Sequence, residues 1–212
     1  MPAAPRPLPE DVSFESAYGI TLEGILQLPE GPPSGAVVLC HPHPGLGGTM
    51  RTPLVVRLAL GLVASGRAVL RFNFRGVGGS QGAMTGGELE LLDVAAAVGY
   101  LRDRLRVARP ALSGWSFGAL MALAHAGTDA KLSAVAAIAP PLGLVPPPAP
   151  GLSAIHAPLL LVVGDRDPYC PADALDPLPG EHVVVTGANH FFWAKEDELI
   201  RTVVGFLGRV GA

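Results

Sequence analysis

The sequence predicts an α/β protein with a mostly parallel sheet covered by helices on both faces. Hydrophobic residues make up 49% of the 212-residue chain and charged residues only 16%. This balance is typical of sheets whose strands are buried on both sides. Beyond residue 30, short apolar runs alternate with segments of helical periodicity. Strands that alternate with helices favour a parallel sheet, because each connecting helix packs on one of its faces.

The strands are predicted from short apolar or alternating runs bounded by turn residues. Two alternating runs, 12–17 and 20–28, flank Tyr18-Gly19 and indicate an antiparallel hairpin at the N-terminus. The remaining strands are apolar runs that follow glycine, proline or polar turns. They are expected at residues 35–40, 68–73, 110–113, 132–139, 159–163 and 182–185.

The helices are predicted from periodicity and from their end signals. One begins near Thr52-Pro53, a favourable pair for the first two helix positions. A second covers 88–106, with acidic residues near its start and arginines near its end, which complement the helix dipole. A third follows Ser116, and a fourth runs from about 192 to 210 with an apolar face.

Composition limits the classes of function. We expect the proline-rich residues 1–10 to be flexible and residues 11–212 to form one domain. The net charge of −3 disfavours nucleic-acid binding, and we see neither a signal peptide nor an apolar stretch long enough for a membrane span. Two cysteines, expected to be reduced, fit a cytoplasmic protein. The oligomeric state stays open, a homodimer included.

One pentapeptide, Gly114-Trp115-Ser116-Phe117-Gly118, predicts a nucleophilic serine. An apolar run that can form a strand precedes it, and a run of good helix formers follows it. A serine between a strand and a helix lies on a sharp turn that exposes its hydroxyl above the sheet. The flanking glycines are needed because such a turn leaves no room for a Cβ atom. A Gly-rich turn without chemistry is the alternative.

A nucleophilic serine needs a base, and the base needs an acid to orient it. In an open parallel sheet both lie after the carboxyl ends of strands. Asp165 and Asp167 follow the strand at 159–163, and His190 follows the strand that ends at 185. The resulting chain order is serine, aspartate, histidine. His125 lies inside a predicted helix, His156 precedes a strand and His182 starts one, which favours structural roles for these three.

The chain resembles the α/β-hydrolase-fold serine hydrolases, in particular the small bacterial members without a cap that are related to dienelactone hydrolase. The shared motifs are His-Pro-His-Pro at 41–44, Gly-Gly-Thr-Met at 47–50 and Arg-Gly-x-Gly-x-Ser-x-Gly at 75–82. Two residues depart from the pattern. Dienelactone hydrolase itself uses a cysteine nucleophile where this chain has Ser116, and Cys170 stands where relatives usually carry an aliphatic residue.

The resemblance implies which residues complete the site. Asp167 corresponds to the acid of the relatives, and Asp165 is the alternative. The oxyanion hole needs two backbone N–H donors. Phe117 is expected to supply one, and His43 the other, since Pro42 and Pro44 have no N–H. The other interpretation of His41 and His43, a metal-binding pair, lacks a third ligand with suitable spacing. No nucleotide-binding motif is present, and no metal or cofactor is expected.

The implied activity is that of a serine carboxylesterase that cleaves small or medium acyl esters through an acyl-enzyme. The segment 140–158, where larger relatives insert a cap, is short and rich in proline, so we expect an open and shallow site. Leu46, Trp115 and Phe191 are expected to bind substrate, and Phe117 and Phe192 could extend the apolar lining. An acyltransferase and a non-catalytic binding protein on the same fold are the alternatives.

Overall fold

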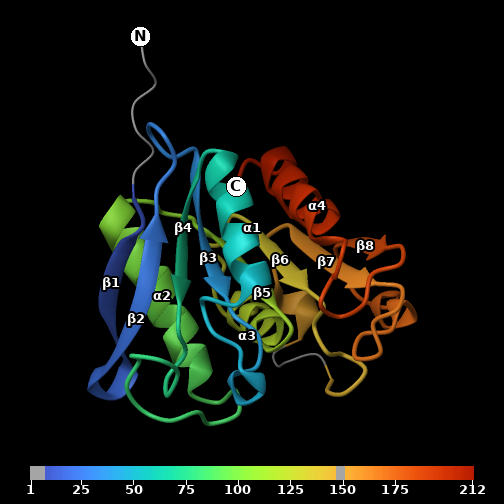
Figure 1. Ribbon diagram of the computed structural model, residues 1–212, viewed down its shortest axis with the longest axis horizontal. Helices are drawn as coiled ribbons and strands as arrows, with labels where there is room; N and C mark the ends of the chain where they lie inside the picture. Colours follow the sequence, from blue (N-terminus) through green and yellow to red (C-terminus); the bar gives the residue numbers. More distant parts are fainter. Residues whose placement is uncertain (1–7, 147–150) are drawn as a thin grey trace.

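The central sheet runs through the whole molecule (Figure 1). The computed structural model describes residues 8–146 and 151–212. Within these residues eight strands form one sheet in the order β1-β2-β4-β3-β5-β6-β7-β8. The strands are β1 (Glu10–Ser16), β2 (Ile20–Gln27), β3 (Gly35–Cys40), β4 (Arg67–Phe72), β5 (Ala111–Trp115), β6 (Val135–Ile138), β7 (Leu159–Gly164) and β8 (Glu181–Val185).

The strand pairing is antiparallel at one end of the sheet and parallel through the rest. β2 pairs antiparallel with both β1 and β4. From β4 through β3, β5, β6 and β7 to β8 every pair is parallel. The predicted α/β class, the mostly parallel sheet and the N-terminal hairpin are therefore confirmed. The parallel arrangement brings the carboxyl ends of β3, β5, β7 and β8 to one edge, which is where the candidate catalytic residues lie.

In the described parts of the chain, four α-helices cover the two faces of the sheet, as the alternating pattern predicts. They are α1 (Pro53–Ala64), α2 (Glu90–Leu105), α3 (Phe117–Ala126) and α4 (Glu196–Arg209). Helices α1 and α4 share one face, and α2 and α3 share the other (Figure 1). Each face has its own buried apolar cluster. None of the helices in the described parts of the chain is long and apolar enough to cross a bilayer.

Most element boundaries lie within two residues of the sequence prediction, and two differ by more. β6 is confined to Val135–Ile138, whereas the apolar run suggested 132–139. The last helix begins at Glu196 rather than near 192, because Phe192 and Ala194 have φ values of 54° and 60°. Left-handed residues cannot lie inside a right-handed helix. The apolar residues just before α4 therefore belong to a loop at the edge of the sheet where the parallel strands have their carboxyl ends.

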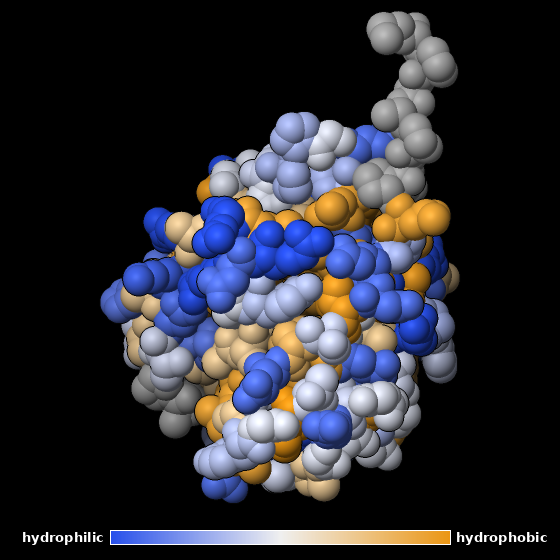
Figure 2. Space-filling model, turned by 90° about the vertical axis from the view of Figure 1, so that its left-hand side faces the viewer, coloured by the Kyte–Doolittle hydropathy of each residue, from blue (hydrophilic) through white to orange (hydrophobic). Residues whose placement is uncertain are grey.

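In the described residues β8 forms one free edge of the sheet, and the other is the strand β1, on the side that Figure 2 turns toward the viewer. Its exposed positions include Glu10, Asp11 and Glu15, and the surface there is a mixture dominated by hydrophilic residues (Figure 2). Charged side chains on an edge strand oppose pairing with another chain. The predicted flexible segment 1–10 falls mainly on residues outside the described part, and Glu10 already belongs to β1.

The motif that begins at Arg75 braces the sheet. Arg75 and Asp93 are fully buried and form a bidentate ion pair, with N–O distances of 2.6 and 3.0 Å. Asp93 also accepts hydrogen bonds from the Arg75 amide at 3.0 Å and from the Ser16 hydroxyl at 2.7 Å. Every charge in the group is thus paired and hydrogen-bonded, as burial demands. The network ties the hairpin, the segment after β4 and helix α2 together.

Candidate active site

The candidate nucleophile lies on a strained turn between β5 and α3. Ser116 has φ 57° and ψ −119°, a conformation that non-glycine residues rarely adopt. A Cβ atom on Gly114 would lie 2.1 Å from the carbonyl oxygen of Gly118. A Cβ atom on Gly118 would lie 2.5 Å from the carbonyl oxygens of both Cys40 and His41. The turn is therefore possible only with glycine on both sides of the serine.

His190 lies within hydrogen-bond distance of both predicted partners. Its Nε2 is 2.9 Å from the Ser116 Oγ, and its Nδ1 is 2.8 Å from the Asp167 Oδ2. Asp167 is an acceptor for the imidazole, so the Nδ1 carries the proton and donates. The Nε2 is then free to accept the serine proton. The three side chains form one continuous chain of hydrogen bonds that ends at a buried carboxylate.

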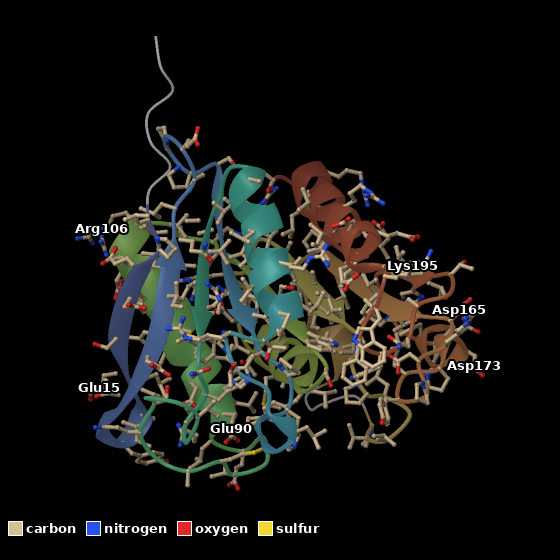
Figure 3. All side chains as sticks on the ribbon, in the orientation of Figure 1. Glu15, Glu90, Arg106, Asp165, Asp173 and Lys195 are labelled. Carbon is tan, nitrogen blue, oxygen red and sulfur yellow. The ribbon has the colours of Figure 1, made fainter. Side chains whose placement is uncertain are left out.

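Asp167 is held in place by the backbone around it. Its second oxygen, Oδ1, accepts hydrogen bonds from the amides of Tyr169 at 2.8 Å and Cys170 at 3.2 Å. The alternative acid, Asp165, instead accepts the Gly187 amide at 2.7 Å and lies near the surface (Figure 3). Of the two aspartates left open by the residue pattern, the structure therefore brings Asp167, and not Asp165, to the histidine.

A close approach between two loops explains how aspartate and histidine meet. A Cβ atom on Gly164, the last residue of β7, would lie 2.2 Å from the carbonyl oxygen of Ala188. The Arg166 amide donates to the same carbonyl at 3.0 Å. The loop after β7 and the loop after β8 are thus joined by backbone contacts. Asp167 comes directly after Arg166 in one loop, and His190 comes two residues after Ala188 in the other. These backbone contacts therefore bring the aspartate and the histidine together.

Aromatic side chains surround the histidine. The Trp115 indole nitrogen donates to the carbonyl oxygen of His190 at 3.0 Å. The rings of Tyr169 and Phe191 pack edge-on against the imidazole at centroid distances of 4.8 and 5.6 Å. Sequence reasoning treated Trp115 only as a lining residue and did not find Tyr169. Both help to fix the orientation of the His190 ring.

The two expected oxyanion donors lie on adjacent segments. β3 pairs with β5 in register up to Cys40 and Gly114, so the loop after β3 lies beside the serine turn. The rings of His43 and Phe117 pack edge to face at 5.3 Å. Phe117 is the first residue of α3, where amides have no acceptor within the helix. Among the residues with described positions, neither the His43 nor the Phe117 amide has a hydrogen-bond acceptor.

The second histidine of the loop, His41, is structural. It is completely buried, its Nδ1 is 2.7 Å from the Pro42 carbonyl oxygen, and its Nε2 accepts the Phe74 amide at 3.2 Å. Burial lowers the pKa of His41 to about 4, so the ring is neutral at physiological pH. Because both ring nitrogens are engaged by the backbone, His41 is not available as a metal ligand, which argues against a metal-binding pair with His43.

Cys170 also has a structural explanation. It is a fully buried residue of the loop after β7, and burial raises the pKa of its thiol to about 11. A thiol that stays protonated at neutral pH is a poor nucleophile. Its backbone amide orients Asp167, as described above. Cys170 therefore contributes to the site through its backbone and its packing rather than through its sulfur chemistry.

A cavity of about 810 Å³ opens directly at Ser116 and His190. Leu46, Trp115 and Phe191, the three predicted substrate-binding residues, all line it, and so does Phe117. Phe192 does not. It is fully buried and packs in the cluster between the sheet and helices α1 and α4. The expectation for Phe192 was therefore wrong, because the turn at 192 directs its side chain into the core.

The proline-rich segment after β6 forms a wall of this cavity. Pro141, Leu144, Val145 and Pro146 line it. The segment is anchored by the Gly143 amide, which donates to the Tyr169 carbonyl at 2.8 Å. A shallow site was expected here, and that expectation needs correction. The prolines prevent a helical cap, and yet the folded-back chain encloses one side of the cavity. Residues 147–150 lie outside the described part.

The chain belongs to the α/β-hydrolase fold family, whose model matches residues 35–154. Fold and family together define the protein as an α/β hydrolase. It is 30% identical over 207 residues to an uncharacterised protein of Rickettsia prowazekii, covering 88% of this chain and 84% of that protein.

Two solved structures show the same architecture. An α/β serine hydrolase homologue from Coxiella burnetii has 33% identity and a TM-score of 0.83, covering 93% of this chain and 97% of that one. A serine hydrolase without a lid from Xanthomonas campestris has 27% identity and a TM-score of 0.82, covering 97% of both chains. The lid-less relative agrees with the absence of a cap domain in the described parts of this chain.

Proposed function

We propose that this α/β hydrolase is a serine carboxylesterase with Ser116 as nucleophile, His190 as general base and Asp167 as the orienting acid. The observation that carries the proposal is the unbroken hydrogen-bond chain from the Ser116 hydroxyl through His190 to Asp167, at 2.9 and 2.8 Å. A histidine with a purely structural role would have no reason to contact a strained serine, a buried carboxylate and an open cavity together. The arrangement has the geometry of nucleophilic catalysis.

In the first half of the proposed reaction, the Ser116 oxygen attacks the ester carbonyl carbon while His190 Nε2 accepts the hydroxyl proton. The carbonyl oxygen becomes an anion and receives hydrogen bonds from the backbone amides of His43 and Phe117. The intermediate then collapses, the bond to the alcohol oxygen breaks, and His190 returns the proton to that oxygen. The products of this half are a free alcohol and an acyl group bound to Ser116.

In the second half, water takes the place of the alcohol. His190 removes a proton from the water as it attacks the acyl carbon, and the same two amides stabilise the anion again. Collapse releases the carboxylic acid and returns the proton to Ser116. Asp167 stabilises the imidazolium that forms in each half without being protonated itself. This sequence requires no metal or cofactor.

Small or medium acyl esters fit the cavity, since its volume is in the ordinary range for small-molecule sites. We further propose kinship with the cap-less relatives of dienelactone hydrolase, supported by the motifs at 41–50 and 75–82. The serine in place of the cysteine favours ordinary esters over dienelactone. An acyltransferase would use the same triad and pass the acyl group to an alcohol instead of water. A non-catalytic protein would bind esters without turnover.

Hydrolysis of p-nitrophenyl acetate and butyrate by the wild type and by Ser116→Ala tests the proposal. We expect wild-type turnover and a loss of several orders of magnitude in kcat for the variant. Product analysis with and without an added alcohol separates hydrolysis from acyl transfer. Turnover that survives in Ser116→Ala, or wild-type binding without turnover, would contradict the esterase assignment.

A further inference from the structure

The cavity extends over both faces of the sheet at its carboxyl edge. Leu120 and Met121 line it from α3 and pack with the apolar cluster between the sheet, α2 and α3. Trp115 lines it and packs with the cluster on the opposite face, beneath α1 and α4. Phe191 lies beside Trp115, with ring centroids 6.0 Å apart. Ser116 stands between the two halves, so the two parts of an ester must occupy different surroundings.

Proton transfer decides which half holds which part of the ester. The alcohol oxygen must lie next to His190 Nε2 to receive its proton. His190 is surrounded by Trp115, Tyr169 and Phe191, so the alcohol part belongs on that side. The acyl part then points away from the imidazole, over Phe117 and along the first turns of α3.

The acyl side is an apolar chamber with walls from two segments. One wall is Leu120 and Met121 on α3. The other is the stretch 144–146, whose flanking residues Leu142 and Leu152 pack in the same cluster as α3. The segment before α2 also borders the chamber, since Gly86 lines the cavity and a Cβ atom on Gly87 would lie 3.1 Å from the Met121 Cε. None of these side chains carries a hydrogen-bond donor or a strong acceptor, so the chamber favours hydrocarbon.

We propose that the physiological substrates are esters of medium-length apolar carboxylic acids, about hexanoyl to decanoyl, with Leu120, Met121 and Leu144 as the residues that set acyl-chain preference. This inference rests on the proposed esterase function. An acetyl group reaches little of the chamber, whereas a longer chain contacts both walls. Each buried methylene contributes about fourfold to binding, so kcat/KM rises by about that factor per methylene until the chamber is filled.

The test is the dependence of kcat/KM on acyl length, measured with p-nitrophenyl esters from acetyl to palmitoyl. The filling variant is Leu120→Trp. Its matched control is Leu60→Trp, at an exposed leucine on α1 that does not line the cavity. We expect Leu120→Trp to lower the octanoyl-to-acetyl ratio of kcat/KM by about tenfold or more, and Leu60→Trp to leave it unchanged.

Leu144→Ser keeps the inference testable should Leu120→Trp fail to fold. Leu144 is 66% exposed, so loss of its side chain does not disturb the core. We expect it to lower the octanoyl-to-acetyl ratio of kcat/KM by about threefold. A wild-type profile that peaks at acetyl, or an unchanged ratio in both chamber variants, would overturn the proposal.

A failure of the proposed esterase function gives a different result: even hydrolysis of the acetyl ester would be absent or independent of Ser116. If instead the acetyl ester is hydrolysed in a Ser116-dependent way without any preference for longer chains, only the proposal of an acyl chamber is refuted.

Discussion

The pair Asp167→Asn and Asp165→Asn separates the two aspartates that share one turn. Asp167 gives one oxygen to His190 and the other to the amides of Tyr169 and Cys170. An asparagine amide has only one oxygen. If that oxygen stays with the two backbone amides, the NH₂ group faces His190 Nδ1. The imidazole must then carry its proton on Nε2, where it cannot accept the Ser116 proton.

The magnitude follows from the alternative orientation. Turning the amide restores the active tautomer and leaves two backbone N–H groups without an acceptor. Each buried unsatisfied group costs about 1–3 kcal/mol. The active form is therefore disfavoured by about 2–6 kcal/mol, and kcat falls between about 30-fold and about 10⁴-fold. In Asp165→Asn the amide oxygen still accepts the Gly187 hydrogen bond, so kcat stays within about twofold.

The assay is kcat for p-nitrophenyl butyrate hydrolysis, with the unfolding temperature of each variant as the control for folding. Both variants should melt close to the wild type or, for Asp167→Asn, a few degrees lower. The reasoning is refuted if Asp165→Asn is the crippling change, or if a folded Asp167→Asn retains more than about a tenth of the wild-type kcat.

Three further predictions concern stability. Asp93→Asn leaves Arg75 as a buried charge with a neutral partner, so urea unfolding should show a loss of about 3–5 kcal/mol; a loss below about 1 kcal/mol would contradict the bracing role. Burial holds the pKa of His41 at about 4 against 6.5 in the unfolded chain, so the unfolded state binds more protons as pH falls. The free energy of unfolding should thus drop by up to about 3 kcal/mol between pH 6.5 and 4, and the slope should be smaller in His41→Gln. Gly118→Ala should cost about 3 kcal/mol or more, whereas Gly99→Ala, in an uncrowded helix position, should stabilise by up to about 1 kcal/mol; equal effects would contradict the tight turn.

Most of the fold could be predicted because buried parallel strands and amphipathic helices leave different periodicities in the sequence. The element boundaries that were predicted wrongly are those that depend on tertiary structure. Nothing in the residues before α4 distinguishes a helix start from a loop, since Phe192 is apolar in either case. Its left-handed backbone depends on the packing of its ring in the core.

The candidate triad was accessible from sequence because its residues follow strands in a fixed order and because the serine turn requires two glycines. The position of the cavity wall formed by residues 141–146 could not be predicted from the sequence. Proline excludes a helix at 140–146 and does not say where the chain runs instead. Its position depends on the hydrogen bond from Gly143 to Tyr169, between segments that no local pattern connects. Leu120 and Met121 could have been found, since they share the helical face of Phe117 at the start of α3.

The central claim, that Ser116 is an activated nucleophile, is tested most directly by covalent labelling. The folded protein is treated with a fluorophosphonate, and the modified residue is located by mass spectrometry of the peptides. We predict one adduct, on Ser116, that is absent in Ser116→Ala and slowed strongly in His190→Ala, because the serine oxygen attacks phosphorus only when a base removes its proton. An adduct on another serine, or a wild-type protein that stays unlabelled, would contradict the account.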